Sequence, residues 1–211
     1  MKFDDLVRII GDEPVFSSSL LLAGARDAND VRRQLSRWVK GGKLIRLRRT
    51  LYIPAEPYRK KPSHPFLLAN RMKSSSYVSL QSALAHYGLI PEYVPVVTSV
   101  TTGRPETFNT PCGSFVFKHV KKNFFTGYIG MSLPDNQSAF VALPEKALLD
   151  LVYLTPSGDD PDYLRALRIQ HPDRLDLGRL RHYATLSGSD KLIRAAERMA
   201  SLLQEVEYVE L

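Results

Sequence analysis

Four prolines within twelve residues constrain the folding of this chain more than any other feature of its sequence. They are Pro54, Pro57, Pro62 and Pro65. Because proline removes a backbone donor and biases the residue before it away from helix, the segment predicts an extended linker. We therefore expect an N-terminal domain over residues 1–54, a linker over 55–65 and a C-terminal domain over 66–211, a division that 211 residues allow.

The net positive charge of the chain lies in its first third. The first 62 residues hold 14 Lys or Arg and seven Asp or Glu, a net charge of +7, whereas the remaining residues hold 15 of each kind. Basicity concentrated in this way is typical of a surface that binds a polyanion such as nucleic acid. A basic surface that is merely solvated is the alternative.

Three helices are predicted in the N-terminal domain. Apolar residues recur at helical spacing over residues 3–10. Three consecutive serines, Ser17 to Ser19, offer N-caps for a short apolar helix over residues 20–23. Asp27 offers an N-cap for a third helix that ends near Lys40.

The third helix has two chemically different sides. The side predicted to face the core carries Val31, Leu35, Trp38 and Val39. The opposite side, with Arg32 flanking it, carries Asn29, Arg33, Ser36, Arg37 and Lys40. Arg and Lys bind guanine edges or phosphates and Asn reads adenine, so this side predicts a helix that enters the major groove of DNA.

A hairpin is predicted after this helix. Residues 43–47 alternate as a strand does, residues 48–50 form a basic turn, and residues 51–53 return as a second strand. Three helices followed by a hairpin with arginines at its tip predict a winged helix-turn-helix, in which the wing contacts phosphates or the minor groove. The predicted DNA-contacting residues are Asn29, Arg32, Arg33, Ser36, Arg37, Lys40, Lys43, Arg46, Arg48 and Arg49.

The C-terminal domain is predicted to be α+β, with a small sheet packed by helices, and the whole chain is therefore assigned to the α+β class. Helices are expected over residues 65–72, 80–87, 144–153, 161–169, 177–186 and 190–203, the second capped by Ser79. Strands are expected over residues 94–101, 113–120, 124–131 and 139–143. The helix over 144–153 is apolar nearly all round, which predicts that it is buried.

The sequence offers no constellation typical of an active site. The five histidines are scattered without zinc-ligand spacing, and Cys112 stands in a Pro-Cys-Gly turn without a catalytic partner. We therefore predict no enzyme activity, no catalytic or metal-binding residues and no cofactor. The single cysteine, an acidic N-terminus and the lack of an 18-residue apolar run predict a cytoplasmic protein with no membrane partner.

Several segments resemble the AbiEi-type antitoxins of abortive-infection, type IV toxin–antitoxin systems. Besides the basic winged helix and the proline-rich hinge, they are residues 77–92 (YVSLQSALAHYGLIPE), 97–104 (VTSVTTGR) and 143–151 (LPEKALLDL). The resemblance covers the chain from about Val31 to Tyr153. One departure is Thr50, which stands where the wing of the family has glycine after two arginines.

The resemblance implies two roles. The N-terminal domain would repress the operon by binding inverted repeats in its own promoter DNA. The C-terminal domain would counter a nucleotidyltransferase-like toxin without requiring a stable complex. The cations considered for that surface are Arg104, Lys118, Lys121 and Lys122. Two alternatives remain open: a protein-interaction module that neutralises a toxin by direct contact without sequence-specific DNA binding, and an enzyme that acts on nucleic acid.

Overall fold

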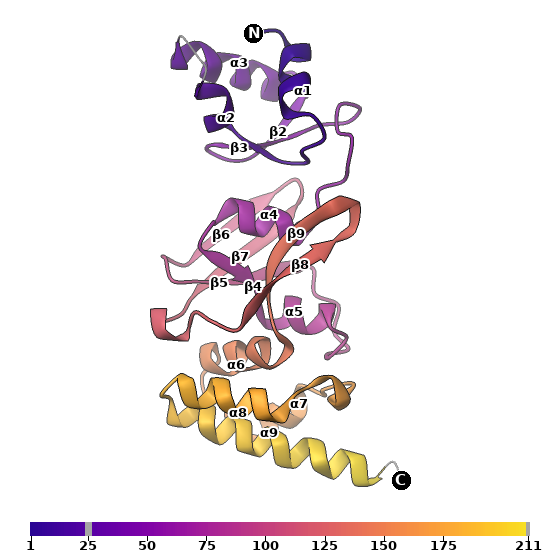
Figure 1. Ribbon diagram of the computed structural model, residues 1–211, viewed down its shortest axis with the longest axis vertical. Coiled ribbons are helices and arrows are strands. Elements are labelled where there is room, and N and C mark those ends of the chain that lie inside the picture. Colours follow the sequence, from indigo (N-terminus) through magenta and orange to yellow (C-terminus); the bar gives the residue numbers. More distant parts are fainter. Residues whose placement is uncertain (24–26, 210–211) are drawn as a thin grey trace.

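The chain is an elongated mixed α+β protein whose sheets are packed by helices. The computed structural model describes residues 1–23 and 27–209. The N-terminal elements lie at one end of the long axis, a larger sheet lies in the middle, and the last two helices form the other end (Figure 1).

The N-terminal part consists of three helices and a three-stranded antiparallel sheet of order β1-β3-β2. Its elements are α1 (Phe3–Ile10), β1 (Phe16–Ser17), α2 (Ser18–Leu22), α3 (Ala28–Lys40), β2 (Leu44–Arg48) and β3 (Leu51–Pro54). The helix predicted over 20–23 therefore starts earlier than expected, because Ser17 is the residue whose side chain accepts the first free backbone N–H.

Both faces of this small sheet are covered. Tyr52 packs with the three helices, in a core that also holds Phe3, Leu35 and Trp38. Its neighbours Leu51 and Ile53 belong instead to the core of the second part of the chain. Because successive side chains of a strand point to opposite faces, β3 contributes to two separate cores.

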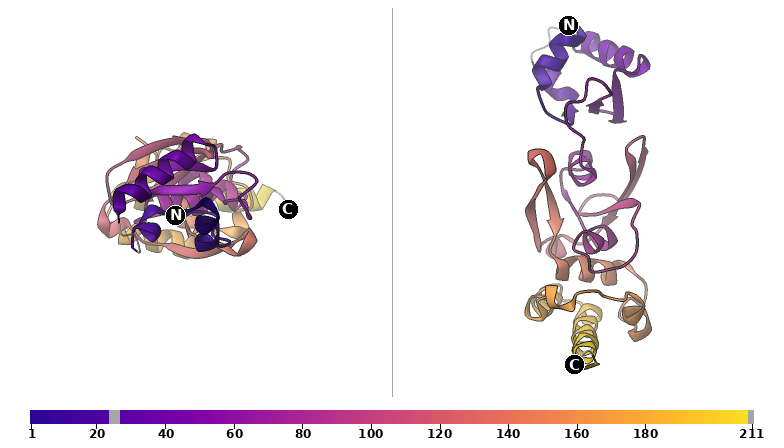
Figure 2. Two further views of the ribbon diagram at one scale, coloured as in Figure 1. Left: turned by 90° about the horizontal axis from the view of Figure 1, so that it is seen from above. Right: turned by 90° about the vertical axis from the view of Figure 1, so that its right-hand side faces the viewer.

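The second part is built around a six-stranded mixed sheet of order β6-β7-β5-β4-β9-β8. Its strands are β4 (Ser76–Val78), β5 (Val96–Thr101), β6 (Glu106–Thr110), β7 (Gly113–His119), β8 (Tyr128–Leu133) and β9 (Gln137–Ala142). Strands β5 and β7 run parallel, as do β4 and β9, and the two edges are antiparallel hairpins. In the right-hand view of Figure 2 these hairpins extend on either side toward the N-terminal part.

Six helices accompany this sheet. They are α4 (Pro65–Met72), α5 (Leu80–His86), α6 (Pro144–Leu154), α7 (Pro161–Ala166), α8 (Leu177–Leu186) and α9 (Asp190–Val209). Helix α4 packs on β4 and β9. It lies at the end of the sheet that is nearest to the N-terminal part (Figure 1). Helix α6 has the sheet and α5 on one side and helices α8 and α9 on the other (Figure 1). It is therefore surrounded by protein.

The proline-rich segment is held on both sides. Residues 55–64 contain neither helix nor strand. Ser63 Oγ donates to Pro14 O at 2.9 Å, while Gln137 Nε2 donates to Pro62 O at 2.7 Å. Gln137 Oε1 also accepts from His64 N at 2.9 Å. The segment is therefore bonded to the N-terminal part and to the β8–β9 hairpin at once.

The predicted burial of the helix after residue 143 is confirmed, and it extends to charged side chains. Lys146 and Asp150, one turn apart on α6, are both fully buried and form an ion pair. Asp150 Oδ2 also accepts from Tyr77 at 3.0 Å and from Ser79 at 2.7 Å. Lys146 Nζ lies 3.7 Å from the centre of the Phe124 ring.

Ser79 therefore has a different role from the one predicted. It occupies the N-cap position of α5, but its side chain makes no capping bond to that helix. Its hydroxyl donates to Asp150 instead. Burial raises the pKa of the Asp150 carboxyl and lowers the pKa of the Lys146 ammonium, and their mutual attraction opposes both shifts.

Substitution of Asp150 by Ala is expected to lower the free energy of unfolding by about 3–5 kcal/mol, because it leaves the Lys146 ammonium buried without its counter-charge. Asp150→Asn, which keeps the shape of the side chain and one acceptor oxygen but not the charge, should fall between the wild type and Asp150→Ala. Urea unfolding followed by circular dichroism measures these changes. Asp162→Ala on α7 is the matched control, because that carboxylate is almost fully exposed; equal effects at both positions would contradict the buried ion pair.

Candidate nucleic-acid interface

Helix α3 presents its basic side to solvent because its apolar side is anchored in the N-terminal core. Asp27 caps the helix by accepting from Asn29 N at 2.8 Å. Val31, Leu35 and Trp38 are buried, and the Trp38 ring meets Phe3 edge-on at 5.3 Å between centroids. The predicted core side of this helix is therefore confirmed for these three residues, and Val39 is half-buried.

The exposed side of α3 carries all six of the predicted contact residues of this helix. They are Asn29, Arg32, Arg33, Ser36, Arg37 and Lys40. Arg33 lies 3.7 Å from Asp27 and 3.8 Å from Asp30, in pairs whose side chains are more than half exposed. Exposed pairs of this length contribute little to stability, so Arg33 can exchange them for a polyanion at small cost.

Asn29 and Arg32 contact one another on this surface. Arg32 donates to the amide oxygen of Asn29 at 3.0 Å, and both side chains are exposed. The bond occupies an oxygen of Asn29 and one of the five donors of Arg32. The positions of these two side chains therefore depend on one another, although each was predicted as an independent DNA contact.

The cations of the β2–β3 hairpin, which follows α3, are not all exposed as those of α3 are. Arg46 and Arg49 are exposed. Lys43 is half-buried, with Nζ 4.8 Å from the centre of the Phe3 ring. The turn between β2 and β3 consists of Arg49 and Thr50, and neither has a positive φ. Thr50 therefore has no left-handed backbone that would favour glycine at this position.

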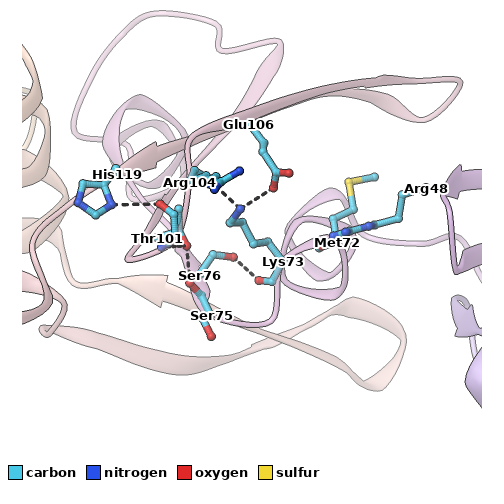
Figure 3. A network of polar contacts seen from close by, with 10 residues as sticks. Arg48, Met72, Lys73, Ser75, Ser76, Thr101, Arg104, Glu106 and His119 are labelled. Atoms are coloured by element: carbon cyan, nitrogen blue, oxygen red, sulfur yellow. Dashed lines mark hydrogen bonds and ion pairs between the residues drawn. The ribbon is translucent and has the colours of Figure 1, made fainter.

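Arg48, one of the predicted DNA-contacting residues, makes its contacts with the second part of the chain. Its guanidinium donates to Met72 O (Figure 3). The guanidinium carbon also lies 5.5 Å from the centre of the Phe108 ring. Arg46 pairs across the hairpin with Tyr52, whereas Arg48 pairs with Leu51 after a register shift. Because paired residues share a face of a sheet, this bulge turns Arg48 toward the core that Leu51 enters.

The four cations considered in the second part lie at one end of its sheet. Parallel strands β5 and β7 both end there, with Thr101 opposite His119. Arg104 follows β5, while Lys118, Lys121 and Lys122 stand at or just after the end of β7, and all four are exposed. His119 Nδ1 lies 3.0 Å from Gly103 O, which joins the two loops.

Lys73 fastens this end of the sheet to α4. It lies between Arg104 and Glu106 in Figure 3, bonding the Arg104 carbonyl at 2.9 Å and the Glu106 carboxylate. The hydrogen bond from Lys73 holds the pKa of Glu106 below its usual range. Lys73 is not predictable from the sequence, because a lysine after a helix gives no sign of a partner 33 residues away.

Groups that could ligate a metal do not gather in the described part of the chain. Residues 1–23 and 27–209 hold no cluster of three or more His, Cys, Asp or Glu side chains placed to bind one ion. Cys112 is half-buried, and burial raises the pKa of its thiol, which makes the nucleophilic thiolate scarcer. Among the described residues, exposed cations are therefore the main chemical feature of the candidate site.

Neither the protein-family models nor the curated proteins that were searched contain a match to this chain. Across the described residues, none of the helices has the length and apolar character required to cross a membrane.

Replacing Arg48 by Ala is expected to lower the free energy of unfolding by about 1.5–3 kcal/mol, because a charge-assisted bond to a backbone carbonyl is lost. Arg46→Ala is the matched control two residues away and should change stability by less than about 0.5 kcal/mol, because its side chain is exposed. Urea unfolding of both variants makes the comparison. Equal, small effects would mean that Arg48 faces solvent as Arg46 does.

Proposed function

We propose that this protein is a sequence-specific DNA-binding regulator whose N-terminal part is a winged helix-turn-helix. The order of elements, α1-β1-α2-α3-β2-β3, fits that class of domain, with α3 as the recognition helix and the β2–β3 hairpin as the wing. The single observation that carries the proposal is the side of α3 opposite Leu35 and Trp38, which exposes four cations together with Asn29 and Ser36.

The proposed roles follow from the chemistry of each side chain. Arg33, Arg37 and Asn29 would reach base edges, since guanidinium and amide groups pair with guanine and adenine there. Backbone or minor-groove contacts would come from Arg32, Lys40, Lys43, Arg46 and Arg49. Arg48 is left out of this set because its guanidinium is bonded within the protein.

The proposal predicts that Arg33→Ala weakens binding to the promoter DNA of its own gene by about 1–3 kcal/mol, on the order of ten- to a hundredfold in Kd. The loss arises because one base position is no longer read, so the variant should discriminate less at that position. Fluorescence anisotropy with the promoter duplex and with single-base variants of it measures both effects.

Arg165→Ala is the matched control for this measurement, because Arg165 is an exposed arginine on α7 that pairs with a carboxylate in the same helix. Its affinity and salt dependence should equal those of the wild type. Full promoter affinity and selectivity of Arg33→Ala would refute the assignment of α3 as the reading helix. A wild-type protein that binds all duplexes alike would refute sequence-specific regulation.

We further infer, from the resemblance to AbiEi-type antitoxins, that the regulator represses its own operon and counters a nucleotidyltransferase-like toxin. The grouping of Arg104, Lys118, Lys121 and Lys122 at one sheet end favours a surface for an acidic partner. This observation also supports the second candidate function, direct neutralisation of a toxin by contact, which needs no DNA binding.

The antitoxin role predicts that co-expression restores growth to cells that produce the nucleotidyltransferase-like protein encoded beside this gene. Lys121→Glu combined with Lys122→Glu should lower that rescue at least tenfold in colony counts, since two cations and two carboxylates leave the surface without net charge. Both side chains are exposed, so folding should stay intact. Arg165→Glu is the control for an added negative charge. An adjacent gene of another kind, or full rescue by the double variant, would overturn this part of the proposal.

A further inference from the structure

A polar cavity lies between the N-terminal sheet and the end of α4. It has a volume of about 520 Å³ and is lined by residues of β1, β2, β3 and the β2–β3 turn on one side, and by residues 70–74 and Glu106 on the other. Pockets for small molecules have volumes of about 300–1,000 Å³, so the cavity is large enough for a ligand of nucleotide size. A DNA duplex is far too wide to enter it.

The charges that line the cavity are mainly positive. Arg48, Arg71 and Lys73 contribute three cations, against the single carboxylate of Glu106. Glu106 is already paired with Lys73. Arg71 has a long ion pair with Glu13, which is not among the lining residues. Two guanidinium groups are therefore in excess among the lining residues, and the cavity favours an anion.

Arg48 is held in place before any ligand arrives. Its bond to Met72 O (Figure 3) and its position over the Phe108 ring restrict the movement of the guanidinium. An ordered guanidinium loses little side-chain entropy when it binds, and its parallel donors match two oxygens of a phosphate. The bulge that pairs Arg48 with Leu51 thus places it in this cavity.

Arg71 is the second, more adaptable cation. Its side chain is 55% exposed, and its ion pair with Glu13 is long, at 3.9 Å. The exposed residues Thr50 and Ser74 at the same cavity add hydroxyl donors, while the buried residues Val15, Leu51 and Met72 form an apolar wall. The cavity therefore offers cationic and hydroxyl donors beside a surface that an organic group can cover.

We propose that this cavity binds a phosphorylated small molecule of the size of a nucleoside monophosphate, with its phosphate between Arg48 and Arg71. A phosphate monoester carries about −1.5 to −2 charges near neutral pH, which matches the two excess cations. The volume of the cavity exceeds that of a phosphate group, and the apolar wall can pack against an organic part of the same ligand. Because both parts of the chain line the cavity, the bound molecule stabilises their contact, and this holds whether or not α3 binds DNA.

The test is isothermal titration of the full chain with inorganic phosphate, the four common ribonucleoside monophosphates and the corresponding nucleosides, at ionic strength matched with sodium chloride. At least one monophosphate should bind and should raise the melting temperature, and its nucleoside should bind at least tenfold more weakly. Arg71→Ala should weaken monophosphate binding about tenfold, the equivalent of about 1.4 kcal/mol for one lost charge-assisted contact. Arg165→Ala, an equal loss of an exposed arginine elsewhere, should bind as the wild type does.

Several outcomes would overturn the proposal. They are the absence of binding by every monophosphate and by phosphate at millimolar concentration, equal affinity for a monophosphate and its nucleoside, and unchanged affinity in Arg71→Ala. A promoter duplex that displaces the monophosphate, together with an equal loss of duplex affinity in Arg71→Ala, would instead assign these cations to the DNA backbone. Loss of DNA binding in Arg33→Ala with normal monophosphate binding would leave the cavity proposal intact.

Discussion

Strand β3 is buried on both of its faces, and the position of the N-terminal part depends on this double burial. Tyr52 closes the core beneath α1 and α3, while Leu51 and Ile53 enter the core of the second part. Burying a side chain of this size stabilises a fold by about 1.5–3 kcal/mol, so the strand connects the two cores energetically as well as covalently. Helix α3 lies at the end of the N-terminal part that is away from the larger sheet (Figure 1), and its basic residues are exposed.

The same junction divides the basic residues of the chain into two groups with different uses. Arg32, Arg33 and Arg37 face solvent, where their charge is available to a polyanion. Arg48 and Lys73 make their bonds within the protein, to the Met72 carbonyl and to the Glu106 carboxylate. The net charge of the chain therefore overstates the number of cations exposed to solvent. Some of the basic residues make internal contacts or line the cavity between the two parts.

A buried ion pair lies at the other end of the large sheet, away from the N-terminal part (Figure 1). Helix α6 is surrounded by protein, yet it carries a buried ion pair between Lys146 and Asp150. Such a pair gains little over an apolar core, but the loss of either partner is costly because it leaves an uncompensated charge buried. Tyr77 and Ser79 complete the arrangement by donating to Asp150 from the strand and from the residue before α5.

Local patterns in the sequence were sufficient for the long helices. The spacing of Val31, Leu35 and Trp38 and the cap at Asp27 predicted α3 and its buried side, because helical periodicity depends on residues close in the chain. Short strands contain too few residues to show a clear alternation of apolar and polar side chains. Strand β1 has two residues, and β4 and β6 were not predicted at all. Such strands exist because of their partners, which lie far away in the sequence.

The sequence by itself determined the α+β class, the basic first third, the basic side of α3 and the break at the prolines. Only the tertiary structure decided that Arg48 faces inward, that Ser79 bonds Asp150 rather than capping α5, and that a cationic cavity lies between the two parts. The reason is physical: helix faces and caps follow from neighbouring residues, whereas a bulge, a buried ion pair and a cavity depend on contacts between residues distant in the chain.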